Sequence, residues 1–206
     1  FRIRKDTGVH PLLRTKPLET NNNSSIPFEL PDTFVALSRE PRAESYVKRA
    51  NAYDAYLAGR VDIRYDFRMN RVVYLIKDGR QLVDAAGRSL DNSKPKWWRY
   101  GKSGVPFICG TSRVGVIVED CSSGCCLSSD FSAVALLGTN LQDSHLPYLR
   151  KYDRLLVALD KDATKKALDL VRRLQAIRPT SLVVLNKDVK DMTDDERKRT
   201  FERYIP

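Results

Sequence analysis

The stretch LLVALDKDA, residues 155–163, decides the fold class of this 206-residue sequence. An unbroken run of aliphatic residues is typical of a strand that is buried on both faces of a parallel sheet. The run leads directly into Asp160 and Asp162, which are separated by one residue. In open parallel sheets, ligands bind at the carboxyl ends of the strands. The stretch therefore predicts a buried strand that ends in a polar site.

Similar apolar runs lie on both sides of this stretch, with helical patterns between them. The runs cover residues 114–118, 133–137 and 182–185, and an apolar stripe of helical period covers residues 163–177. Alternation of this kind predicts an α/β unit with a parallel sheet. Thr193 and Glu196 have the spacing of a capping box, which predicts one further helix.

Acidic residues also follow the first and the last of these runs, at Glu119, Asp120, Asp188 and Asp191. Side chains alternate along an extended chain, so Asp160 and Asp162 can point the same way while Glu119 reaches in from a neighbouring strand. One acid after a strand is often only a helix cap, but acids after several strands indicate a site. Carboxylate oxygens are ligands that Mg²⁺ and Mn²⁺ prefer. We expect Glu119, Asp160 and Asp162 to be catalytic and to bind Mg²⁺ or Mn²⁺, with the other three acids as a secondary set.

The first half of the chain has a different pattern. Residues 1–31 are rich in Pro, Asn and Ser and predict an extended arm or linker. Apolar residues at helical spacing predict one amphipathic helix over residues 42–57. The runs 71–76 and 81–86, joined through Asp78-Gly79, predict a tight β-hairpin. These elements predict a smaller mixed α+β unit ahead of the parallel sheet.

The positive charge of the protein lies almost entirely in this first half. The formal net charge is +10, and the first 114 residues carry 21 Lys and Arg against 12 Asp and Glu. A basic unit beside a carboxylate-rich one suits an enzyme that holds a nucleic acid and acts on it with a divalent metal. Lysines and an arginine alternate with candidate stacking residues for single-stranded DNA, which are Trp97, Trp98 and Tyr100. The alternatives are a merely solvated surface and an aromatic plug between the two units.

Several other classes of protein or site are disfavoured. No apolar run approaches the roughly 20 residues needed to span a bilayer, so we expect a soluble protein of the bacterial or host cytoplasm without a membrane partner. Four cysteines, three of them at Cys121, Cys125 and Cys126, lack paired zinc-site spacing. We expect reduced, mostly buried thiols and no zinc. The first residue is not Met, which suggests a fragment or a start that lies before residue 1.

Residues 114–191 resemble a TOPRIM domain, the metal-binding fold shared by bacterial-type DNA primases, topoisomerases and some nucleases. The resemblance is carried by VIVE at 116–119, LLGT at 136–139, ALDKDA at 158–163 and the pair Lys190-Asp191. It implies that Glu119 and the two aspartates of the D-x-D motif bind divalent metal. The sequence departs from the primase pattern at Asp120, where primases usually have glycine, and at Ser123, where an acid is common.

The segment before this domain resembles the one that precedes TOPRIM in the RNA-polymerase core of DnaG-type primases, with phage or plasmid replication enzymes as the nearest kin. The matching stretches are NRVVYLI at 70–76, AGRSL at 86–90 and PKWW at 95–98. The resemblance implies an arm at 1–31, a basic α+β subdomain at 32–112 and a TOPRIM domain at 113–206. The candidate template- or nucleotide-binding residues are Arg68, Arg71, Arg88, Lys96, Arg99 and Lys190.

The resemblance implies a DNA primase that synthesises short RNA primers on single-stranded DNA from nucleoside triphosphates, by divalent-metal-dependent nucleotidyl transfer. A replicative helicase, or a helicase or zinc module fused to the same chain, would be a further partner. Two alternatives stay open. One is a TOPRIM metal-dependent nuclease or topoisomerase fragment, and the other is a non-catalytic nucleic-acid-binding module with a decayed metal site.

Overall fold

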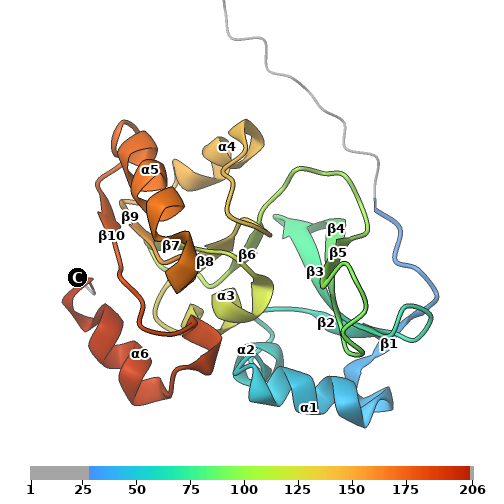
Figure 1. Ribbon diagram of the computed structural model, residues 1–206. Coiled ribbons are helices and arrows are strands. Elements are labelled where there is room, and N and C mark those ends of the chain that lie inside the picture. The colour runs from blue at the N-terminus through green and yellow to red at the C-terminus, as the bar shows by residue number, and fades with distance from the viewer. Residues whose placement is uncertain (1–27, 205–206) are drawn as a thin grey trace, which may run out of the picture.

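The computed structural model describes residues 28–204, so most of the expected arm at 1–31 lies outside the described residues. The described chain builds two five-stranded sheets that lie side by side (Figure 1). One sheet is antiparallel and the other is mostly parallel. This arrangement confirms the expected combination of an α+β unit with a parallel α/β unit.

The first sheet has the strand order β1-β2-β3-β4-β5. Its strands are β1 (Phe34–Ala36), β2 (Ile63–Asp66), β3 (Arg71–Asp78), β4 (Gln81–Ser89) and β5 (Trp97–Arg99). Asp78 pairs with Gln81, so β3 and β4 are joined by a two-residue turn. Gly79 in this turn has φ of +58°, a conformation that glycine adopts without steric cost. The predicted hairpin is therefore confirmed.

Two helices, α1 (Pro41–Arg49) and α2 (Tyr53–Leu57), occupy the region between β1 and β2. The prediction of one continuous helix over 42–57 was wrong, because the chain turns at Asn51. Asn51 has φ of +53°, and asparagine enters this left-handed region more readily than most residues. The break lets both helices pack their apolar sides into the angle between the two sheets (Figure 1).

The second sheet has the strand order β10-β9-β7-β8-β6. Its strands are β6 (Phe107–Cys109), β7 (Val114–Val118), β8 (Ser132–Ala135), β9 (Arg154–Val157) and β10 (Thr180–Leu182). Every pairing in it is parallel except that of β6 with β8. The run predicted as a strand at 182–185 forms one at 180–182 instead. Beyond Leu182 the chain leaves the sheet, and Val184 is exposed.

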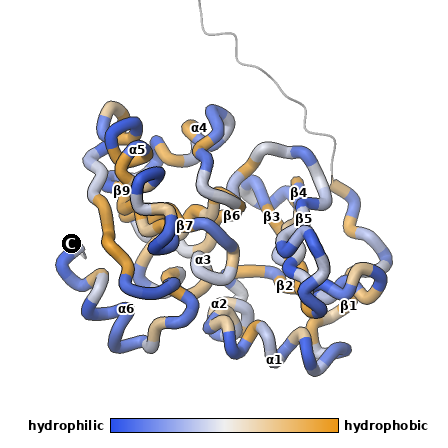
Figure 2. The backbone as a smooth tube through the Cα atoms, in the orientation of Figure 1, coloured by the Kyte–Doolittle hydropathy of each residue, from blue (hydrophilic) through white to orange (hydrophobic). Residues whose placement is uncertain are grey.

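Helices cover both faces of the second sheet. Helix α3 (Cys121–Leu127) packs on one face, while α4 (Leu146–Leu149) and α5 (Thr164–Gln175) pack on the other. The side chains of β7 alternate accordingly, with Val116 and Val118 on the α3 face and Ile117 on the α5 face. The strands are hydrophobic, whereas the last helix, α6 (Asp194–Phe201), is largely hydrophilic (Figure 2). The capping box predicted for α6 is present.

One hydrophobic core runs through the joint between the sheets. Tyr74 of β3 meets Phe107 of β6 edge-on, with ring centroids 6.0 Å apart, and Trp97 packs on Tyr74 at 5.8 Å. Strand β6 lies within the predicted basic subdomain, 32–112, yet it belongs to the second sheet. The sheets therefore divide between β5 and β6, ahead of the predicted domain boundary. No helix in the described part of the chain is both long and apolar enough to cross a membrane.

Candidate active site

Two acidic residues, Glu119 and Asp160, lie at the carboxyl ends of β7 and β9. These strands are parallel neighbours, as expected, so their ends lie at the same edge of the sheet. Glu119 follows β7 directly, and Asp160 follows β9 after two residues. The backbone N–H of Asp160 donates to Glu119 Oε1 at 3.1 Å. Asp162 lies two residues further along, in a short 3₁₀ turn, Lys161–Ala163, and is exposed.

Lys190 partly neutralises the acidic edge, which is the end of the second sheet that carries Glu119, Asp120, Asp160, Asp162 and Asp188. Asp120 caps α3 by accepting the N–H of Ser123 on Oδ1 at 2.8 Å, while its Oδ2 accepts from Lys190 Nζ at 3.3 Å. Lys190 Nζ also donates to Asp188 Oδ2 at 2.8 Å. Asp191 is exposed at the end of the 3₁₀ turn Val189–Asp191, which also contains Lys190. Of the secondary acids, Asp120 and Asp188 are therefore drawn into the site.

The acids raise one another's affinity for protons. Burial, and then the charges of Asp162, Asp120 and Asp188, raise the pKa of Glu119. The pKa of Asp160 is raised to about 6, chiefly by burial, with Glu119, Asp188 and Asp120 adding to the effect and Lys190 opposing it. Burial would lower the pKa of Lys190, but the surrounding carboxylates outweigh it and hold the pKa above its ordinary value. The edge thus carries more negative charge than one lysine offsets.

This donor set fits a hard divalent cation, because Mg²⁺ and Mn²⁺ prefer carboxylate oxygens and would relieve the repulsion among the acids. Glu119, Asp160 and Asp162 are the residues that would hold it. Within residues 28–204, no three acidic, histidine or cysteine side chains are gathered in a ready-made metal cage. One oxygen of Glu119 already accepts the backbone N–H of Asp160.

Tyr46 of α1 lies between the first sheet, here called the basic sheet, and helix α3, which follows Asp120. Arg88 of β4 places its guanidinium carbon 5.7 Å from the Trp97 ring centroid and 6.0 Å from that of Tyr46. The Tyr46 hydroxyl is hydrogen-bonded to Ser122 Oγ at 3.3 Å, two residues after Asp120. The pKa of Tyr46 is raised, chiefly by burial, and the charges of Arg88, Asp120 and Lys190 all act on it. Tyr46 therefore contacts both Arg88 of the first sheet and Ser122 of α3, close to Asp120.

Several solved DNA primase structures have a similar architecture. The zinc-binding and RNA polymerase domains of the Aquifex aeolicus primase superpose with a TM-score of 0.63 at 22% identity, covering 82% of this chain and 56% of that one. A DNA primase domain from Pseudomonas aeruginosa superposes with a TM-score of 0.55 at 20% identity, covering 84% of this chain and 62% of that one. The chain has the fold of a DnaG primase catalytic core. A DnaG primase catalytic domain bound to single-stranded DNA gives a TM-score of 0.52 at 21% identity, covering 81% of this chain and 59% of that one.

The chain spans less than two thirds of the length of each of these primases. No protein-family model and no curated protein matches its sequence. The likeness is therefore one of fold.

The template-binding candidates of this primase fold divide into exposed and engaged side chains. Arg68 and Lys96 are exposed, and so is Trp98. Arg71 is buried instead, and its guanidinium donates to the carbonyl oxygens of Pro95 at 2.9 Å and Gly87 at 3.2 Å. In this arrangement Arg71 fixes the loop that carries Lys96.

Three further candidates are held within the protein. Arg99 donates to Asp84 Oδ2 at 2.7 Å and to the carbonyl oxygen of Val105 at 2.6 Å. The Tyr100 hydroxyl donates to Asp66 Oδ2 at 2.6 Å. Trp97 is half-buried and packs against the core that joins the sheets, as in the plug interpretation. The hydrogen bonds of Arg99 to Asp84 and Val105 and of Tyr100 to Asp66 were not evident from the sequence, because these partners lie six or more residues away along the chain.

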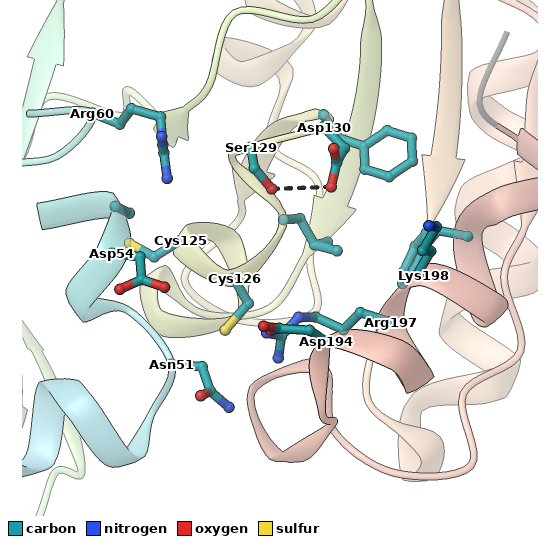
Figure 3. Close-up of a pocket in the computed structure, with 14 residues that line it drawn as sticks. Asn51, Asp54, Arg60, Cys125, Cys126, Ser129, Asp130, Asp194, Arg197 and Lys198 are labelled. Carbon is teal, nitrogen blue, oxygen red and sulfur yellow. Dashed lines mark hydrogen bonds and ion pairs between the residues drawn. The ribbon is translucent and has the colours of Figure 1, made fainter. Parts of the chain in front are cut away.

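A cavity of about 380 Å³ is lined by residues of α2, α3 and α6 (Figure 3). Cys125 and Cys126 of α3 and Arg197 of α6 line it, together with Asn51, and none of the predicted site residues does. All four cysteines are free thiols, and three are buried. Asn51 also donates to the carbonyl oxygen of Lys190 at 2.8 Å, a role that the sequence analysis missed. Its only signal in the sequence was an asparagine within a helical pattern.

Proposed function

We propose that this chain is the catalytic core of a DNA primase, which condenses nucleoside triphosphates into short RNA primers on a single-stranded DNA template with Mg²⁺ or Mn²⁺. The observation that carries the proposal is the hydrogen bond from the backbone N–H of Asp160 to the carboxylate of Glu119, which joins the ends of two neighbouring parallel strands. This pair lies in a primase fold, and the part of the sequence before it carries most of the excess positive charge. The acidic pair and the basic first half also agree with the resemblance of the sequence to DnaG-type primases.

The residues of the acidic edge would hold the metal. Glu119 and Asp160 supply half-buried carboxylates, and Asp162 supplies an exposed one. A divalent cation bound there would neutralise the triphosphate and stabilise the transferred phosphate as a 3′ hydroxyl attacks it. The acids favour cation binding because their charges are close together and partly desolvated.

The basic sheet would hold the nucleic acid and the nucleotide. Arg88 is half-buried, and its Nε has no hydrogen-bond partner among the described residues. That atom is buried, so a phosphate would contact the rest of the guanidinium, which the aromatic rings of Tyr46 and Trp97 keep in place. Arg68, Lys96 and Trp98 offer exposed charge and an aromatic face to a template strand.

A single incubation separates this function from its alternatives. The protein is mixed with single-stranded DNA, nucleoside triphosphates and Mg²⁺ or Mn²⁺, and the products are resolved by length. Short oligoribonucleotides support primase activity, cleavage of the DNA supports a TOPRIM nuclease, and binding without either product supports a non-catalytic module. Asp160→Ala should abolish synthesis and retain DNA binding. Asp169→Asn, on the exposed face of α5, is the matched control and should leave synthesis unchanged.

A further inference from the structure

The ammonium group of Lys190 lies on one side of the acidic edge, where it pairs with two carboxylates. Its ammonium group lies 2.8 Å from Asp188 Oδ2 and 3.3 Å from Asp120 Oδ2, and only 18% of its side chain is exposed. Both carboxylates belong to the secondary acids that the sequence placed at strand ends. Lys190 therefore stands where a second metal ion would have to bind if it used these two carboxylates.

The backbone around Lys190 is fixed from outside the sheet. Asn51, at the break between α1 and α2, donates its side-chain amide to the carbonyl oxygen of Lys190 at 2.8 Å and to that of Met192 at 3.4 Å. Val189 and Met192, on either side of Lys190, are buried. These anchors hold the turn against the acidic edge and limit how far the ammonium group can withdraw.

The remaining acids form a separate half of the edge. Glu119 and Asp160 are in contact through the backbone amide of Asp160, and neither makes an ion pair with Lys190 within the hydrogen-bonding range. Metal ions of this class need several oxygen ligands that are not already committed to another cation. Asp120 and Asp188 are paired with Lys190, whereas Glu119, Asp160 and Asp162 make no ion pair with it, although its charge also acts on Asp160.

We infer that Lys190 is a resident cation that takes the place of a second divalent ion, so that the acidic edge binds one Mn²⁺ or Mg²⁺ through Glu119, Asp160 and Asp162. This inference rests on the proposed metal-dependent function and specifies its metal stoichiometry. It gives Lys190 a role in charge balance at the site, in place of the template or nucleotide contact expected from the sequence.

The test is a Mn²⁺ titration of the metal-free protein without nucleotide, with free Mn²⁺ followed by electron paramagnetic resonance. The wild-type protein should bind one ion, and Lys190→Gln, which removes the charge, should bind two. Lys190→Arg keeps the charge and should bind one. Lys187→Gln is the control, because Lys187 pairs with Glu196 away from the acidic edge.

The outcomes separate the inference from the proposed function. Two ions in the wild-type protein, or one ion in a folded Lys190→Gln variant, would overturn the inference and leave the metal site intact. No bound ion in the wild-type protein, or unchanged binding in Asp160→Asn, would overturn the metal site itself. If Lys190→Gln does not fold, the wild-type stoichiometry decides, since one ion supports the inference and two ions refute it.

Discussion

Asp160→Asn should make the metal-free protein more stable at neutral pH while removing its metal site. The pKa of Asp160 is raised from 3.8 to about 6, chiefly by burial, so the folded state holds this proton more tightly than the unfolded state does. Each unit of pKa shift corresponds to about 1.4 kcal/mol, which gives an upper value of about 3 kcal/mol. Because Asp160 is only half-buried, solvent screening reduces the expected gain to about 2 kcal/mol.

The raised pKa of Asp160 determines the pH range over which the free energy of unfolding changes. A raised folded-state pKa costs stability at pH values above about 6, and this cost disappears as the pH falls through 3.8. The wild-type protein should therefore lose stability relative to Asp160→Asn as the pH rises from about 4 to about 6. Asparagine has nearly the shape of aspartate, so the substitution removes the charge without opening a cavity.

Urea denaturation in the presence of a chelator measures this difference at several pH values. Asp160→Asn should exceed the wild-type protein by about 2 kcal/mol at pH 8 and match it near pH 4, and Asp169→Asn should differ from the wild type by less than about 0.5 kcal/mol. Saturating Mn²⁺ should stabilise the wild-type protein, by about 2.7 kcal/mol at a hundredfold excess over Kd, and should not stabilise Asp160→Asn. An Asp160→Asn variant that is no more stable than the wild type at pH 8 would refute the reasoning.

Three other predictions follow from the contacts. Burial, with help from Arg99, lowers the pKa of His145 from 6.5 to about 4. The free energy of unfolding should therefore fall by up to about 3 kcal/mol as the pH drops from 6.5 to 4. In unfolding curves measured over this pH range, His145→Gln should remove that fall, and an unchanged fall would contradict the prediction. Asp84→Ala should lower the free energy of unfolding by about 3 kcal/mol, because the buried carboxylate pairs with Arg99 and accepts the N–H groups of Gly101 and Ser103. A loss below about 1 kcal/mol in urea denaturation would count against a stabilising role for this ion pair. Arg88→Ala should reduce the salt dependence of single-stranded DNA or nucleotide binding by about one phosphate contact, and an equal slope in both proteins would show that Arg88 is structural.

The parallel sheet could be predicted from the sequence because burial on two faces leaves a simple pattern. The apolar runs at 114–118 and 155–159 coincide with β7 and β9 to within two residues, and the acids after them mark the strand ends. The edge strand β10 was misplaced because it begins at the polar Thr180, while apolar residues continue beyond its end. Apolar content therefore located the central strands better than the edge strand.

The roles of individual charged side chains could not be predicted in the same way. A sequence shows that Arg71 and Arg99 are basic, but their partners are backbone carbonyls and a buried Asp84 that only the folded chain brings near. Asn51 was read as part of one helix, because a left-handed residue leaves no periodic signal. These residues stabilise the loops and turns around the site, so their roles depend on tertiary contacts.

Anomalous diffraction from crystals of the protein soaked in Mn²⁺ tests the central claim most directly, since it locates the ion itself. The account predicts one anomalous peak at the ends of β7 and β9, bounded by Glu119, Asp160 and Asp162, with Lys190 still paired to Asp120 and Asp188. The absence of a peak at saturating Mn²⁺, or a peak that none of these three carboxylates contacts, would contradict it.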